Sequence, residues 1–113
     1  MRDDRELLRD ILEAIENIEK YAVRGRGACE GDELIQTWML HHLQIIGEAS
    51  RALSPAFREQ HSQIPWSKIV GMRHILVHHY FEINFDLVWS VIEVHLPEFK
   101  NLITAILQDL GGP

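Results

Sequence analysis

Apolar residues recur at three- and four-residue steps along most of the chain, which is the spacing of one face of an α-helix. The first apolar stripe runs from residue 7 to residue 22 and follows Asp3 and Asp4, either of which can cap a helix start. Gly25 and Gly27 come after the stripe, and glycine commonly ends a helix. We therefore expect a first helix up to these glycines, with the sequence RGRGACEG forming a loop.

Three more helix starts can be read further along the chain. Asp32 can cap a second helix, whose apolar face extends to Ala49. The pair Ser54–Pro55 is typical of a cap followed by proline in the first turn, which predicts a short helix through about Gln60. Pro65 then begins a third long helix.

The last predicted helix starts near Asn84, a capping residue, and carries Asp86 in its first turn, where the helix dipole favours an anion. Its apolar stripe runs from Val88 to Leu110, and Pro97 inside it predicts a kink or break near residues 93–97. No segment alternates convincingly as a strand. We therefore expect an all-α antiparallel bundle of four main helices plus a short one, forming a single domain over residues 1–113.

Composition narrows the class of protein. Hydrophobic residues make up 46% of the 113 and charged residues 25%, as in ordinary soluble domains. Cys29 is the single cysteine, so no intrachain disulfide can form and a reducing, cytoplasmic setting is expected. The charged N-terminus is not typical of a signal peptide, and no apolar run approaches the length of a membrane helix.

The net charge of −6 argues mildly against nucleic acid as a partner, but the charges are unevenly distributed. Residues 51–80 form the one positive zone, with Arg51, Arg58, Lys68 and Arg73 against a single acidic residue. Four of the seven histidines lie in the same zone. A phosphate backbone would dock there, although scattered surface cations are the simpler explanation of the charges alone.

The stretch GMRHILVHHYF, residues 71–81, places polar groups in an apolar run within this positive zone. On a helical wheel Tyr80 falls within about 20° of Arg73, so the two can share a face. His78 reaches them if the helix ends or unwinds near it. Such a group suits RNA cleavage, because RNA supplies the 2′-hydroxyl nucleophile, histidine can transfer the proton and arginine can bind phosphate oxygens. Tyrosine can position the phosphate or stack a base, and no metal is required.

Two other interpretations of the stretch remain open. His74 and His78 are four residues apart and could bind zinc together with His41 or His42, although no CxxC or HExxH pattern accompanies them. A purely structural arginine–tyrosine contact at the end of the bundle would also explain the spacing. We expect the other histidines to be packing or surface residues and the tryptophans to be core residues: His41, His42, His95, Trp38, Trp66 and Trp89.

The stretch RHILVHHY has the form R-x4-H-x-Y and resembles the signature of the HEPN superfamily, most closely that of its HepT-like toxins. The similarity extends from Leu43 to Lys100, where IIGEA, IPW, GMR, VHHYF, LVW and LPEFK occur in the family's order. One position departs from the pattern, since His74 stands where such motifs often carry Asn or Asp.

The resemblance implies a homodimeric all-α fold with two motifs facing one cleft. It implies a metal-independent endoribonuclease without cofactor, acting on RNA, with transfer RNA as a plausible class. Arg73 and His78 would be catalytic, His74 and His79 supporting polar residues, and Tyr80 the hydroxyl to which a partner MntA-like nucleotidyltransferase antitoxin transfers AMP. The alternative from a different class is a non-catalytic helical module that only binds such a partner.

Overall fold

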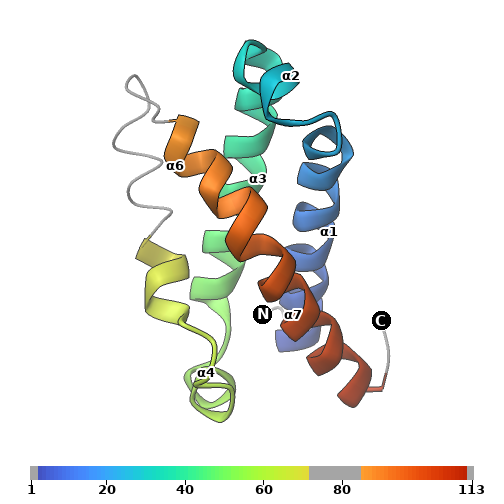
Figure 1. The fold of residues 1–113 in the computed structure, drawn as a ribbon. Helices are drawn as coiled ribbons and strands as arrows, with labels where there is room; N and C mark the ends of the chain where they lie inside the picture. The colour runs from blue at the N-terminus through green and yellow to red at the C-terminus, as the bar shows by residue number, and fades with distance from the viewer. Residues whose placement is uncertain (1–2, 72–84, 112–113) are drawn as a thin grey trace.

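The computed structural model describes residues 3–71 and 85–111, and these residues are helical, without strands (Figure 1). The elements are α1 (Asp4–Ala22), α2 (Arg26–Glu30), α3 (Glu33–Ala52), α4 (Pro55–Gln60), α6 (Phe85–Ser90), the π-helical η1 (Val91–His95) and α7 (Leu96–Asp109). Residues 66–71 are also helical. The prediction of an all-α fold is thus confirmed over this part of the chain, and no helix within it is long and apolar enough to cross a membrane.

The bundle is built around the long antiparallel pair α1 and α3 (Figure 1). α7 packs against α1, and the run from α6 through η1 to α7 crosses the front of this pair from one end of the molecule to the other. Of the helix predicted to begin at Pro65, the structure describes the helical residues 66–71, and the rest of that prediction lies outside the described residues.

The predicted capping residues explain where three helices begin. Asp3 caps α1, accepting a hydrogen bond from the backbone N–H of Glu6 at 2.9 Å. Asp32 caps α3, and its Oδ1 accepts from Leu34 N–H at 3.0 Å and Ile35 N–H at 3.1 Å.

The third cap also joins two helices. Ser54 caps α4, where its Oγ accepts from Phe57 N–H at 3.2 Å and donates to Oδ2 of Asp4 at 2.7 Å. Asp4 therefore ties the start of α1 to the start of α4 instead of capping α1.

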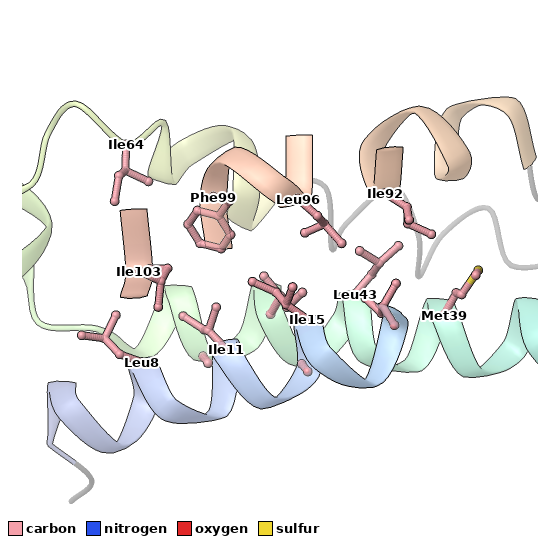
Figure 2. Packing of buried hydrophobic residues seen from close by; sticks show 14 of the residues in the cluster. Leu8, Ile11, Ile15, Met39, Leu43, Ile64, Ile92, Leu96, Phe99 and Ile103 are labelled. Carbon is pink, nitrogen blue, oxygen red and sulfur yellow. The ribbon is translucent and has the colours of Figure 1, made fainter. Parts of the chain in front are cut away.

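The predicted apolar stripes form the core (Figure 2). Side chains from α1, α3 and the α6–η1–α7 run, including Phe99, meet there together with Ile64. Trp66 and Trp89 are buried as expected, whereas Trp38 is only half-buried and its Nε1 donates to the Asn17 carbonyl at 2.7 Å. Leu110, predicted to close the last stripe, is exposed because α7 ends one residue before it.

Two sequence predictions need correction or refinement. The RGRGACEG segment is not simply a loop, because it contains α2, whose Cys29 is fully buried. The disturbance predicted at Pro97 takes the form of a π-helical turn just before it, where Leu96 N–H bonds the Val91 carbonyl. Proline lacks an N–H and its ring collides with the carbonyl four residues earlier, and the wider π turn accommodates both effects without breaking the helix.

Candidate functional site

The candidate site residues Arg73, His74, His78, His79 and Tyr80 lie outside the described residues, as does the predicted cap Asn84. The structure does describe the two helical segments between which this stretch runs. One is the helical segment 66–71, and the other is α6. The packing of these two segments against the bundle fixes where the motif begins and ends.

The segment before the motif is anchored by Trp66. Its side chain is buried, and its Nε1 donates to the His61 carbonyl at 3.0 Å. The indole ring lies edge-on to Phe99 of α7 and tilted against Phe57 of α4, with both ring centroids 6.1 Å away. The chain consequently enters the motif from a position held by α4 and α7 together.

The segment after the motif is anchored by aromatic stacking within α6. The Phe85 ring stacks on the Trp89 ring at a centroid distance of 6.1 Å. Trp89 is buried and its Nε1 donates to the Glu93 carboxylate at 2.6 Å. The chain thus leaves the motif on a helix whose first residue, Phe85, is fixed by its contact with Trp89 one turn later.

α2 also contacts the start of α6. Arg26 forms an ion pair with Asp86, its guanidinium lies 5.9 Å from the centre of the Phe85 ring, and its Nε is 3.6 Å from a Glu30 oxygen. From the sequence, Asp86 is expected only to complement the helix dipole. Sequence reasoning misses this contact because it joins residues 60 positions apart through a short helix where the glycines predict a loop.

Positive charge remains exposed in the described part of the 51–80 zone. Arg51 and Lys68 are exposed, Arg58 is half-buried, and Glu59 is the single acidic residue between positions 51 and 71. None of these three cations forms an ion pair with another residue that the structure describes. This positive surface directly precedes the motif in the chain.

The histidines within the described segments behave as expected of packing or surface residues. His42 is buried, with its Nδ1 2.8 Å from the Trp38 carbonyl, while His41 and His95 are exposed. Over residues 3–71 and 85–111, no three His, Cys, Asp or Glu side chains gather as metal ligands. The zinc interpretation depends on His74 and His78 and stays untested.

Comparison with known proteins places this geometry in context. The family model for "Ribonuclease HepT-like" matches residues 11–106. "Putative RNase TTE0752" of Caldanaerobacter subterraneus subsp. tengcongensis is 40% identical over 68% of this chain and 69% of its own length. "Probable ribonuclease HepT" of Thermococcus cleftensis is 35% identical over 88% of this chain and 91% of its own.

A longer relative, "Gamma-glutamylcyclotransferase and putative RNase MJ0434" of Methanocaldococcus jannaschii, is 36% identical over 97% of this chain. The present chain spans half of that protein's length. No solved structure gives a significant match.

Proposed function

The chain belongs to the HepT-like ribonuclease family, and from this premise we propose that it is a metal-independent endoribonuclease toxin with Arg73 and His78 as its catalytic residues. The observation that carries the proposal is an intact R-x4-H-x-Y motif, within the span matched by the family, in the one positive zone of an acidic chain. The anchored segments on either side of the motif support it, since catalytic groups need a rigid scaffold.

The proposed reaction is attack by the RNA's own 2′-hydroxyl on the adjacent phosphorus. A bond forms between the 2′-oxygen and phosphorus, and the bond from phosphorus to the 5′-oxygen of the next nucleotide breaks. The 2′-hydroxyl loses its proton and the departing 5′-oxygen takes one up. His78 accepts the first or donates the second, and water exchanges the other, because an imidazole titrates near neutral pH. Arg73 holds the non-bridging phosphate oxygens and stabilises their negative charge as it develops. His74 and His79 are supporting polar residues in this proposal.

Two partners complete the proposal. A second copy of the chain brings two motifs to one cleft, and an MntA-like nucleotidyltransferase serves as the antitoxin. This partner transfers AMP to Tyr80, which adds negative charge and bulk where an RNA phosphate must bind. Transfer RNA is the proposed class of substrate.

The experiment is RNA cleavage in EDTA by the wild-type protein and by Arg73→Ala and His78→Ala. We expect each variant to lose at least about 100-fold in rate, the usual scale for removing a proton-transfer group or a charge-stabilising donor. His95→Ala is the matched control, since His95 is an exposed imidazole on η1 and should leave the rate unchanged. Cleavage by both motif variants at the wild-type rate would refute the assignment.

The same variants separate an enzyme from a non-catalytic interaction module. An enzyme arrests growth on induced expression, and His78→Ala relieves the arrest. A module that only binds its partner would affect growth equally with and without the imidazole.

A further inference from the structure

α4 and the helical segment 66–71 enclose a groove, which we call the Arg58 groove. Pro55 and Arg58 of α4 line one wall, and the other is lined by Trp66, Ser67, Val70 and Gly71. Its volume is about 570 Å³. These two elements lie together at the lower left of Figure 1, on the side of the molecule where the chain enters the motif.

Arg58 lines this groove with one of its donors unsatisfied. Its Nε is buried and has no hydrogen-bond acceptor. Among the described residues, no carboxylate pairs with its guanidinium, and the neighbouring Glu59 is exposed. A guanidinium keeps its charge at any ordinary pH, and a buried donor without an acceptor costs free energy. The position therefore calls for an acceptor that the described protein residues do not supply.

The composition of the groove indicates which kind of acceptor fits. Ser67 adds a hydroxyl to the guanidinium, and both can donate to an anionic oxygen. Pro55 and Val70 give apolar walls against which a sugar or base can pack. The exposed Lys68 lies on the same helical segment, so the local charge favours a phosphate. Gly71, which also lines the groove, precedes Arg73 by two positions in the chain.

We propose that the Arg58 groove binds a backbone phosphate of the RNA substrate at a nucleotide next to the cleaved bond. This inference rests on the proposed ribonuclease function and extends it, since Arg58 lies outside the R-x4-H-x-Y motif. Arg58 is a substrate-binding residue in this arrangement and does not contact the reacting atoms. Its contribution is the same in the ground state and the transition state, so it lowers KM and leaves kcat unchanged.

The first test compares Arg58→Gln with Arg58→Lys and with Arg9→Gln, in EDTA. Arg9 is an exposed arginine on α1 outside the positive zone, which makes it a matched control. We expect Arg58→Gln to raise KM about tenfold with kcat within about twofold, as for loss of one charged phosphate contact. Arg58→Lys should give an intermediate KM, because it keeps the charge and loses the fork geometry. Arg9→Gln should match the wild type.

The second test uses binding instead of turnover. An RNA oligonucleotide with 2′-O-methyl groups cannot be cleaved through its 2′-oxygen, so its Kd can be measured against salt concentration. Removing one phosphate contact should reduce the slope of log K against log salt by about 0.7. A neutral methylphosphonate, moved along the strand one linkage at a time, should weaken wild-type binding at one position and have no such effect on Arg58→Gln.

Each outcome has a defined meaning. Absence of RNA cleavage by the wild-type protein would overturn the proposed function itself. Normal cleavage with unchanged KM and Kd in Arg58→Gln would overturn the groove assignment alone, as would a loss confined to binding of the nucleotidyltransferase. If Arg58 only stabilises the end of α4, both Arg58 variants would lower the melting temperature while KM of the folded protein stays unchanged, which also overturns the assignment.

Discussion

At the scale of single residues, the reactivity of Cys29 is determined by its surroundings. Cys29 is fully buried in α2, and its Sγ lies 3.3 Å from the Tyr21 carbonyl. Burial raises the pKa of its thiol, while Arg24 lowers it and Asp32 raises it to smaller extents. Since the thiolate is the reactive form, this cysteine should be chemically inert in the folded protein.

We predict that the Cys29 thiol reacts with iodoacetamide far more slowly in the native protein than in urea. A thiol whose pKa is raised by folding stays protonated where the unfolded chain ionises. Stability from this group is therefore complete below the ordinary pKa of 9.0 and is lost as pH rises above it. Between pH 7 and pH 10, the free energy of unfolding measured in urea should fall less for Cys29→Ala than for the wild type. Equal losses would contradict the assignment.

A second prediction at this scale concerns the two tyrosines of the chain, Tyr21 and Tyr80. Incubation with ATP and the cognate nucleotidyltransferase should add one or more AMP units to the wild-type mass, and cleavage activity should fall with the extent of labelling. Tyr80→Phe should take up no AMP, because it lacks the accepting hydroxyl. Tyr21→Phe is the control. Tyr21 packs edge-on against Trp38, so the Tyr21→Phe protein should still take up AMP as the wild type does. Full labelling of Tyr80→Phe would contradict the proposal.

At the level of elements, the helix starts are the features that the sequence predicts best. Asp3, Asp32 and Ser54 cap helices by bonding backbone N–H groups within three positions, so the local sequence suffices to find them. α2 could not be found in this way. It has five residues, one of them Gly27, and a glycine at each end, and it is held by distant contacts, namely the burial of Cys29 and the Arg26–Asp86 pair.

The candidate site shows the same division between local and distant information. Arg73, His78 and Tyr80 stand out through their spacing and through a family resemblance that family membership now confirms. Arg58 does not stand out, because its buried, unsatisfied Nε depends on how α4 packs against residues 66–71. Pro97 is an intermediate case. The sequence predicts where the helix is disturbed, but only the structure shows that the disturbance is a π-helical turn.

The cap of α3 gives a prediction about a whole element. Asp32 accepts hydrogen bonds from two backbone N–H groups, and α3 is one of the two central helices. We expect Asp32→Ala to lower the free energy of unfolding by about 1 kcal/mol, measured by urea denaturation. Asp32→Asn, which keeps the accepting oxygen, should lose less. Equal losses in the two variants would show that the carboxylate charge, and not the hydrogen bonds, stabilises this helix end.

For the whole molecule, the proposed function requires that an acidic protein bind RNA. One chain carries −6, so a pair carries −12, yet residues 51–80 are positive. Because screening limits the reach of charges to about 10 Å, the local surface governs where a phosphate docks. Two copies that bring their positive zones to one cleft would form a larger positive surface than either chain alone. Dimerisation is therefore expected to be a condition for activity.

This expectation leads to a complementation experiment. If each active site combines Arg73 of one subunit with His78 of the other, then Arg73→Ala and His78→Ala fail for different reasons. A mixed dimer of the two contains one site with both wild-type residues and one with neither. Random exchange makes about half of all dimers mixed, so the mixture should recover about a quarter of the wild-type rate.

The necessary controls are each variant alone, which should stay inactive, and native mass spectrometry, which should show mixed dimers in the active sample. Each dimer should have twice the 13.1 kDa mass of one chain. If mixed dimers form and no activity returns, the guanidinium and the imidazole act within one subunit. Dimerisation would then have to assist cleavage through the combined charge of the cleft. In that case the cleavage rate of the wild-type dimer should fall as the salt concentration rises.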